Sequence, residues 1–402
     1  MDALTTPLNW QRVRLGTYKY RRGSFPQPYG NPQWYSDNGM PFVQVYDVGE
    51  NFKLTQKTKQ KISKIAQPMS VFVPKNSVII TLQGTIGRVA LTQYDCYCDR
   101  TILIFDNNTL NDVNKYFFVL SLFTKFEEEK RKADGSIIKT ITKQTLKDFE
   151  IPLPPLNEQI AIANILSDVD RYLYSLDALI LKKEGVKKAL SFELLSQRKR
   201  LKGFNQNWQR VRLGTYKYRR GSFPQPYGNP QWYSDNGMPF VQVYDVGENF
   251  KLTQKTKQKI SKIAQPMSVF VPKNSVIITL QGTIGRVALT QYDCYCDRTI
   301  LIFDNNTLND VNKYFFVLSL FTKFEEEKRK ADGSIIKTIT KQTLKDFEIL
   351  LPPLNEQIAI ANILSDVDSE IISLKNKKHQ FENIKKALNH DLMSAKIRVL
   401  KQ

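Results

Sequence analysis

The sequence is poor in the residues on which enzymes and secreted proteins most often depend. Its 402 residues include two histidines, His379 and His390, and four cysteines. No Ser/His or Cys/His nucleophile pair can be built from residues 1–378, because they contain no histidine. The cysteines are too few and too closely spaced for a secreted disulfide scaffold, so reduced thiols are expected. The nucleotide-binding motifs G-x-x-x-x-G-K-[ST] and G-x-G-x-x-G are also absent.

Long apolar runs and acidic residues are scarce as well. No run of about 18 apolar residues that could span a bilayer occurs, and the start of the chain, MDALTTPLNW, lacks the basic and apolar regions of a signal peptide. A cytoplasmic protein with no membrane partner is therefore expected. The 59 Lys and Arg residues exceed the 39 Asp and Glu residues, for a net charge of +20. A hydrophobic content of 41% supports folded cores and excludes wholesale disorder.

What the sequence does contain is a long tandem repeat. Residues 9–170 match residues 207–368 at an offset of 198, and Pro152 against Leu350 is the one mismatch. A period of this length is a whole domain with a connecting element, not a solenoid repeat. We therefore expect a globular domain over residues 1–156, a helix over 157–201, a second domain over 202–354 and a second helix over 355–402.

The globular segments have the pattern of a mixed α/β domain. Short β-branched and aromatic runs bounded by Gly, Asn, Asp or Pro predict strands at residues 41–48, 77–82, 88–92 and 101–105. A helical pattern follows at about residues 112–132. The expected fold class is α+β, with two domains in tandem separated by two long antiparallel coiled-coil helices in a pseudo-two-fold arrangement.

The connecting segments predict those two helices. Pro154 and Pro155 bar helix upstream, and Asn157 is placed to cap the first helix. Apolar residues then recur at the 3-4 spacing of a coiled-coil seam. The seam residues are Leu166, Val169, Leu173, Leu176 and Ile180 in the first helix and Leu364, Val367, Ile371 and Leu374 in the second. Because each seam needs a partner, we expect the helices to pair with each other, with a kink near Gly185.

Most of the positive charge lies in the globular segments. Residues 10–156 carry 21 Lys and Arg against 13 Asp and Glu, and the second copy repeats this excess, whereas each helical segment has an excess of only two. A basic excess concentrated in two domains is the footprint expected of nucleic-acid binding. Basic composition that only aids solubility is the alternative.

One loop gathers side chains that can contact DNA bases. Residues 20–35 (YRRGSFPQPYGNPQWY) contain Arg, Gln and Asn, which bind guanine or adenine edges, and prolines that reduce the entropy lost on ordering. A purely structural loop is the alternative. The predicted contacts are Arg21, Arg22, Ser24, Gln27 and Tyr29, and in the second copy Arg219, Arg220, Ser222, Gln225 and Tyr227.

Two further turns carry polar side chains. The turn at residues 83–88 (QGTIGR) joins two predicted strands, so it either presents Gln83, Thr85 and Arg88 to DNA or only shapes a hairpin. Its G-x-x-G spacing is not that of a KH domain, whose loop joins helices. Residues 134–143 predict a turn followed by the phosphate donors Lys139 and Thr142, with an exposed polar loop as the alternative. The second copy places these contacts at Gln281, Thr283, Arg286, Lys337 and Thr340.

Two other motifs are better explained by structure than by chemistry. Cys96 and Cys98 have no histidine nearby, so two cysteines on one face of a strand is a better interpretation than a zinc site. Glu128 and Lys130 fit half of a nuclease motif, but they lie in a helical charge run over residues 127–132. No catalytic residue and no metal site are predicted.

The entry to each helix resembles a motif of a known family. Residues 151–170, IPLPPLNEQIAIANILSDVD, recur from Ile349 onward, and the turn GTIGR and the pair Gly135-Ser136 accompany them. Through these motifs the whole chain resembles the specificity subunit, HsdS, of type I restriction-modification systems. The resemblance implies two target-recognition domains that each read half of a split double-stranded DNA site, and helices that dock two methyltransferase subunits. It also implies a non-catalytic chain without a cofactor, whose methyltransferase and restriction partners use S-adenosylmethionine, ATP and Mg²⁺.

The identity of the two domains departs from the family, whose members normally carry two different ones. Direct repeats joined by antiparallel helices are related by a 180° rotation, so each domain should read the same word on opposite strands. The expected target is an interrupted palindrome with half-sites about 10 bp apart, centre to centre. An adaptor that binds a symmetric protein partner is the alternative function. Leu350 in place of Pro152 should have little effect.

Overall fold

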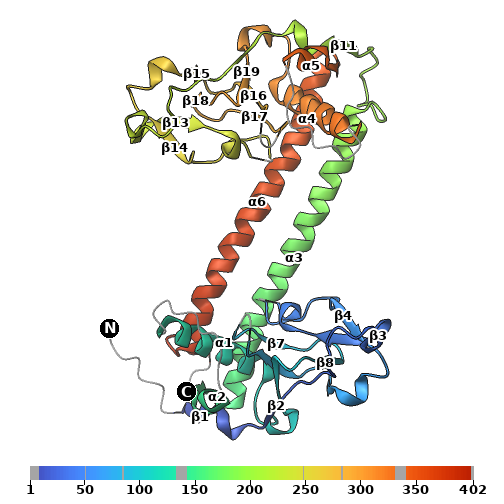
Figure 1. Cartoon of the computed structure of the whole chain (residues 1–402), viewed down its shortest axis with the longest axis vertical. Coiled ribbons are helices and arrows are strands. Elements are labelled where there is room, and N and C mark those ends of the chain that lie inside the picture. The colour runs from blue at the N-terminus through green and yellow to red at the C-terminus, as the bar shows by residue number, and fades with distance from the viewer. Residues whose placement is uncertain are drawn as a thin grey trace. The chain divides into compact units, whose positions relative to one another are not determined.

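The structure, a computed structural model, describes residues 9–49, 51–83, 86–132, 143–247, 249–281, 284–330 and 341–399, without the side chains of Lys143 and Lys341. The chain divides into two units, one formed by Met1–Ala178 with Asn376–Gln402 and the other by Leu179–Lys375. Each unit contains one α+β domain, the first half of one long helix and the second half of the other (Figure 1). The long helices are therefore shared between the units.

The two domains contain the same elements in the same order. The first has β1 (Gln11–Arg14), β2 (Tyr20–Arg22), β3 (Tyr35–Val43), β4 (Gln60–Ile62), β5 (Val71–Val73), β6 (Val78–Thr81), β7 (Val89–Leu91), β8 (Cys96–Cys98), β9 (Ile102–Phe105), α1 (Lys115–Lys132), α2 (Lys143–Asp148) and β10 (Glu150–Leu153). The second has β11 (Gln209–Arg212), β12 (Tyr218–Arg220), β13 (Tyr233–Val241), β14 (Gln258–Ile260), β15 (Val269–Val271), β16 (Val276–Thr279), β17 (Val287–Leu289), β18 (Cys294–Cys296), β19 (Ile300–Phe303), α4 (Lys313–Lys330), α5 (Lys341–Asp346) and β20 (Glu348–Leu351). The long helices are α3 (Leu156–Leu195) and α6 (Leu354–Met393).

The strands of the first domain form two four-stranded sheets and one pair. The first sheet has the order β2-β9-β6-β7 and is antiparallel throughout. The second has the order β4-β3-β8-β5, with β3 and β8 parallel. β1 pairs with β10, which ties the start of the domain to the strand that leads into α3. The second domain repeats each pairing.

The sequence predictions agree with most of these elements. The strands predicted at 77–82, 88–92 and 101–105 are β6, β7 and β9, and the helix predicted at 112–132 is α1. The strand predicted at 41–48 is wrong beyond Val43, because Val45–Asp47 forms a 3-10 turn. The Asp47 carboxylate accepts hydrogen bonds from the backbone N–H of Gln44 at 2.9 Å and of Lys59 at 3.1 Å. Such local side-chain bonds compete with a strand ladder.

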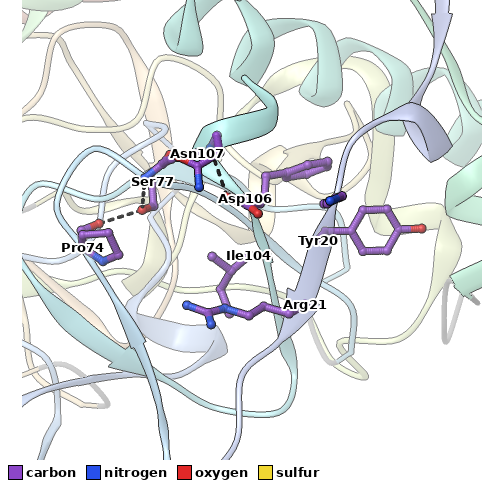
Figure 2. A pocket seen from close by; sticks show the side chains of 10 residues that line it. Tyr20, Arg21, Pro74, Ser77, Ile104, Asp106 and Asn107 are labelled. Carbon is purple, nitrogen blue, oxygen red and sulfur yellow. Dashed lines mark hydrogen bonds between the residues drawn. The ribbon is translucent and has the colours of Figure 1, made fainter. Parts of the chain in front are cut away.

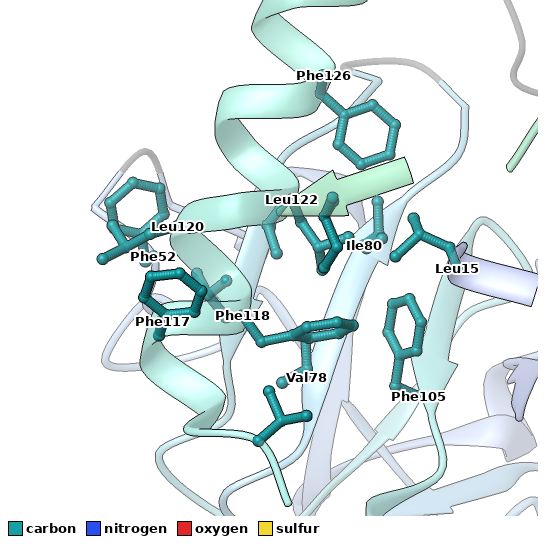
Figure 3. Packing of buried hydrophobic residues seen from close by; sticks show 14 of the residues in the cluster. Leu15, Phe52, Val78, Ile80, Phe105, Phe117, Phe118, Leu120, Leu122 and Phe126 are labelled. Atoms are coloured by element: carbon teal, nitrogen blue, oxygen red, sulfur yellow. The ribbon is translucent and has the colours of Figure 1, made fainter. Parts of the chain in front are cut away.

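Both faces of the β2-β9-β6-β7 sheet are buried, because its central strands are continuous apolar runs. On one face the side chains of Val78, Ile80 and Phe105 pack against α1, as Figure 3 shows. On the other face alternate residues such as Ile79 and Ile104 pack against the β4-β3-β8-β5 sheet. Each domain thus has three layers, with α1 outermost on one side and the β4-β3-β8-β5 sheet on the other.

The cysteines belong to the core between the sheets. Cys96 and Cys98 are fully buried, and both are free. Tyr97, between them, joins an aromatic cluster on the opposite face of β8. The prediction of two cysteines on one face of a strand is confirmed. Burial is the largest of the effects that raise the pKa of the Cys98 thiol, so it stays protonated.

The long helices run antiparallel within each unit. In the first unit Lys378 of α6 lies 2.6 Å from Asp177 of α3, and Lys385 pairs with Asp170. In the second, Lys183 pairs with Glu370 at 2.7 Å. Residue numbers therefore rise along one helix as they fall along the other. The expectation that the helices pair with each other is confirmed within each unit.

The predicted seam residues are buried or half-buried. Leu166 and Leu364 are fully buried, and Leu176, Ile180 and Ile371 are nearly so. Val169, Leu173, Val367 and Leu374 are half-buried. α3 is continuous through Gly185, and it begins at Leu156, one residue before the predicted cap. The N-cap position is therefore Pro155, whose carbonyl accepts the first helical bonds, and the Asn157 side chain still accepts from the N–H of Glu158 at 2.9 Å. Among the described residues, no helix combines the length and apolarity needed to cross a membrane.

A buried ion pair joins the start of each long helix to the end of the other. Glu158, 2% exposed, accepts from the Arg398 guanidinium at 2.8 and 3.2 Å and from the Trp10 indole at 3.1 Å. In the second unit Glu356 does the same, with Arg200 at 2.7 and 3.2 Å and Trp208 at 3.2 Å. The glutamate of the P-P-L-N-E-Q motif is therefore the point at which domain, helix start and helix end are held together.

Candidate nucleic-acid interface

The loop over residues 23–34 is anchored to the outer face of the β4-β3-β8-β5 sheet. At Gly23 the chain passes so close to β8 that an added Cβ would lie 2.3 Å from the carbonyl oxygens of Cys98 and Asp99. Phe25 is buried against Phe42 of β3, with ring centroids 4.3 Å apart. The Ser24 hydroxyl donates to the Met69 carbonyl at 3.1 Å. The aromatic part of the loop is therefore structural.

Tyr29 uses its hydroxyl inside the domain. The hydroxyl donates to the Asp99 carboxylate, and the Tyr29 carbonyl accepts from the Tyr35 hydroxyl at 2.7 Å. Burial first, and then the bond to Asp99, raise the pKa of Tyr29 well above its usual value. The side chain stays neutral and holds the loop in place. Its predicted counterpart Tyr227 makes the same bond to Asp297.

The polar side chains of the same segment face outward. Arg22 and Gln27 are exposed, as are Arg220 and Gln225 in the second copy. Arg21 donates one N–H to the Phe72 carbonyl at 3.0 Å, and Arg219 donates to Phe270 at 3.1 Å. A guanidinium has five N–H donors, so this bond orients Arg21 and leaves donors for a ligand.

A pocket of about 610 Å³ opens beside β2, lined by Lys19, Arg21, Ser77, Asn107 and Asn108 among others (Figure 2). The Asn107 amide donates to the Ser77 hydroxyl at 3.0 Å, which donates in turn to the Pro74 carbonyl at 2.8 Å. The buried Asn107 Oδ1 accepts no hydrogen bond within the described part of the chain. Arginine, lysine and amide groups of this kind suit a phosphate or the edge of a base.

The turn predicted at 83–88 is partly described. β6 and β7 pair as a hairpin, and Gly87 has a φ of +76° with the Phe126 ring 3.0 Å from an added Cβ, so glycine is required there. Gln83 and its counterpart Gln281 are exposed. Arg88 is half-buried and donates to the Val48 carbonyl at 3.1 Å, as Arg286 does to Val246. The predicted contacts Thr85, Lys139, Thr142, Thr283, Lys337 and Thr340 lie outside the described residues.

A row of lysines in β4 and in the residues on either side of it was not singled out from the sequence. This lysine row consists of Lys57, Lys59, Lys61 and Lys64, all exposed. Among the described residues, none of the four has a carboxylate within ion-pair distance. The signal that would have found it is the K-x-K-x-K spacing of residues 57–61, which matches the period of an extended chain. The second domain carries the equivalent row of Lys255, Lys257, Lys259 and Lys262.

The charge run at the end of α1 differs, because its cations are paired within the helix. Lys130 lies 2.7 Å from Glu127, and Lys132 lies 2.6 Å from Glu128. The bond from Lys132 is the main cause of the lowered pKa of Glu128. This is the helical charge run that the sequence predicted. Within the described residues no cluster of three His, Cys, Asp or Glu side chains could hold a metal ion.

With this geometry in view, comparison with known proteins identifies the family. The family model for the type I restriction modification DNA specificity domain matches residues 28–184 and again residues 225–383. The chain belongs to this family. It is a specificity subunit of a type I restriction-modification system with two recognition domains.

Individual relatives agree with this assignment. The type I restriction enzyme MjaVIII specificity subunit of Methanocaldococcus jannaschii is 23% identical over 427 residues, which cover 99% of this chain and 95% of that protein. The putative MjaX specificity subunit of the same organism is 28% identical over 298 residues, 70% of this chain and 68% of its own. Both relatives are named as type I specificity subunits.

Solved structures share the fold. The crystal structure of the type I restriction-modification S subunit from M. genitalium superimposes with a TM-score of 0.60 at 17% identity and covers 97% of each chain. A structure from a study of complex assembly and conformational transition of the type I system gives a TM-score of 0.57 at 17% identity, over 97% of this chain and 98% of its own. The expected α+β fold class, with two tandem domains and two long helices, is confirmed.

Proposed function

We propose that this specificity subunit directs a type I complex to an interrupted palindrome, with each recognition domain reading the same half-site. The observation that carries the proposal is the identity of the two domains in sequence and in geometry. Arg21 and Arg219 bond to equivalent carbonyls at 3.0 and 3.1 Å, and Ser24 and Ser222 do so at 3.1 and 3.0 Å. Two identical surfaces prefer the same bases. The connectivity is reciprocal as well, because each unit takes the start of one long helix and the end of the other.

The side chains that would read bases are the exposed polar groups of the 20–35 segment. Arginine and glutamine can each make two hydrogen bonds to one base edge, which is worth about 1–3 kcal/mol of discrimination. Arg22 is exposed at the end of β2, and Gln27 is exposed on the following loop, which Phe25 and Tyr29 hold in place, so little freedom is lost on binding. Arg21 and Ser24 already use polar groups in hydrogen bonds to the domain. They would orient the loop and add DNA contacts from the point where the loop begins.

We also propose that the long helices dock two methyltransferase subunits, with restriction subunits completing the complex. The seam side chains Leu166 and Leu364 are buried within the chain, so docking would use the exposed helix faces. Leu181, 71% exposed on α3, is an apolar residue available there. The partners would bring S-adenosylmethionine, ATP and Mg²⁺, and the chain itself would hold no cofactor. A subunit that directs chromosomal DNA methylation works in the cytoplasm.

The decisive experiment is to co-express the chain with its methyltransferase subunit and read every methylated base of the host genome by single-molecule sequencing. The expected result is methylated adenine in both halves of an interrupted palindrome, with half-site centres about 10 bp apart. An asymmetric methylated motif would contradict the proposal that both domains recognise the same half-site. A complex that forms but adds no methylation would favour an adaptor function instead.

A further inference from the structure

We propose that the lysine row of β4, and its equivalent on β14, is the surface that grips the DNA phosphate backbone and sets the position of the 23–34 loop on the bases. The inference rests on the proposed function, since it names the part of each recognition domain that meets the backbone. Phosphate contacts position a protein on DNA, whereas base contacts specify the sequence. A base-reading loop therefore needs a neighbouring surface of unpaired cations.

The row is a concentrated and unneutralised positive charge. Four lysines occur within eight residues, 57–64, and none has an acidic partner in the described part of the chain. Asp47, the described carboxylate that precedes the row most closely along the chain, is 1% exposed. It already accepts from the backbone N–H groups of Gln44 and Lys59. Asp47 thus fixes the backbone that carries the row without screening its outward face.

The row lies on an edge that is open to a long ligand. β4 pairs only with β3 among the described strands, and it lies on the side of the domain remote from α1 (Figure 1). Side chains of a strand alternate between its faces, so Ile62 enters the core while Lys59 and Lys61 do not. Lys59 is held 4.3 Å above the exposed ring of Tyr46, and Lys61 donates to the Asp37 carbonyl at 2.8 Å. These contacts order the two side chains and leave their charge in place.

Direct hydrogen bonds connect the row to the proposed reading loop. The backbone N–H of Ser63 donates to the Trp34 carbonyl at 2.9 Å, and its hydroxyl donates to the Gln33 carbonyl at 2.6 Å. Ser63 sits between Lys61 and Lys64, so the end of the loop and the end of the row form one piece of structure. A phosphate bound by the lysine row would fix the position of the loop along the duplex.

A second role for edge lysines has to be separated from this one. Lysines on an exposed edge strand also prevent other strands from pairing with it. A row with only that role would protect against self-association and leave DNA affinity unchanged. The two roles predict different measurements on the same variant.

The test compares two triple substitutions that remove the same charge. The first is K57Q/K61Q/K64Q with the matching changes at Lys255, Lys259 and Lys262; Lys59 is kept because of its contact with Tyr46. The matched control is K130Q/R131Q/K132Q with Lys328, Arg329 and Lys330, where the lysines are paired with Glu127–Glu129 or their counterparts. Each full chain, in complex with its methyltransferase partner, is titrated with a duplex carrying the methylated motif and with a scrambled duplex, at several salt concentrations. Thermal melting and light scattering check folding and self-association.

The row variant is expected to bind both duplexes more weakly, by on the order of 100-fold at physiological salt, with the preference for the motif retained. Its slope of log affinity against log salt should fall by about 0.9 for each phosphate that the row no longer neutralises. The control should keep the affinity and the slope. Unchanged DNA binding by a folded row variant, with or without self-association, would overturn the inference and leave the proposed function standing. An equal loss in the control would also overturn it, because net charge alone would then matter. A parent complex with no preference for the motif would instead refute the proposed function.

Discussion

The two recognition domains are nearly identical in sequence, whereas the second halves of the two long helices differ from each other at many positions. The domains agree at every position but one, whereas the helices diverge after Asp170 and Asp368. At the offset of 198, Lys183 corresponds to Phe381, and Gly185 corresponds to Asn383. Although Leu195 differs from Met393, several other positions where a helix end meets a domain are identical at the offset of 198 residues. Arg200 and Arg398, Lys187 and Lys385, Leu190 and Leu388, and Leu194 and Leu392 are such pairs.

This pattern shows which helix residues the domains require. Leu388 and Leu392 pack against the core of the first domain, and Leu190 and Leu194 pack against that of the second. Divergent residues such as Lys183 and Phe381 contact the other long helix, through an ion pair with Glu370 and a ring contact with Tyr172. The domains therefore constrain several of the helix-end residues that touch them, whereas more residues differ in the middle of the helical pair. The comparison predicts that substitutions at positions identical in both copies lower the free energy of unfolding strongly, and that substitutions elsewhere lower it little.

The largest effect is expected from Arg398→Ala and its equivalent Arg200→Ala. Either change leaves a buried glutamate with one remaining donor, the Trp10 or Trp208 indole, and an unpaired buried charge costs about 3 kcal/mol. Urea unfolding of the full chain, followed by circular dichroism, measures the loss. Because the cost lies in the charge of Glu158, adding E158Q to R398A should restore part of the stability.

The control for that prediction is K183A together with K378A. Both lysines make ion pairs across the helices, at 2.7 and 2.6 Å, but at divergent positions and with exposed partners. Exposed pairs of this kind contribute about 0.5 kcal/mol. If the lysine variant lost as much stability as the arginine variant, the distinction between retained and divergent positions would fail.

A smaller effect is expected at the contact between α1 and α3. The Tyr116 hydroxyl donates to the Asp170 carboxylate, to which Lys385 of α6 also binds. Y116F with Y314F removes a hydrogen bond to a charged group in each unit, at a cost of about 2 kcal/mol each. Denaturant unfolding at pH 7 measures it, and Y174F, at an exposed tyrosine of α3, is the matched control.

The same tyrosines predict a dependence on alkaline pH. Burial first, and then the bond to Asp170, raise the pKa of Tyr116 above its usual value of 10.0. A group whose pKa is raised by folding contributes stability that is complete below pH 10 and is lost as the pH rises further. The parent chain should therefore lose stability above pH 10 more steeply than Y116F/Y314F. Parallel curves of melting temperature against pH for the two proteins would contradict this assignment.

Local patterns were sufficient to predict most of the fold, whereas the DNA-contact residues stay predictions. Residues 78–81 and 102–105 are apolar on both faces, and such a run predicts a central strand without knowledge of its neighbours. The strand predicted through Val48 failed because Asp47 bonds to Gln44 and Lys59, and the second of these contacts spans 12 residues. The DNA contact predicted for Tyr29 stays a prediction, but its hydrogen bond to Asp99 joins residues 70 positions apart, which no local pattern could predict.

The lysine row shows why charge counts do not locate a binding surface. Lys57 and Lys130 both lie in short basic runs, but Lys130 directly follows three glutamates. In the structure Lys130 is paired with Glu127 one helical turn away, whereas Lys57, three residues before β4, has no such partner among the described residues. Whether a lysine is neutralised therefore depends on which residues the local secondary structure brings beside it.

The smallest effect is expected at the single position where the domains differ. Pro152 lies opposite Arg12 in the β1–β10 pair, and Leu350 lies opposite Arg210 in the same register. Proline cannot donate a ladder hydrogen bond, and it is tolerated where a strand has only one partner, as β10 does among the described strands. P152L should lower the free energy of unfolding by about 0.5 kcal/mol, because loss of the proline increases the conformational entropy of the unfolded chain. DNA affinity should not change. Titration of P152L, and of the reverse change L350P, with a duplex that carries the motif found methylated in the genome measures the affinity. A marked loss of affinity in either would mean that the two domains are not equivalent readers, and the expectation of a symmetric site would have to be abandoned.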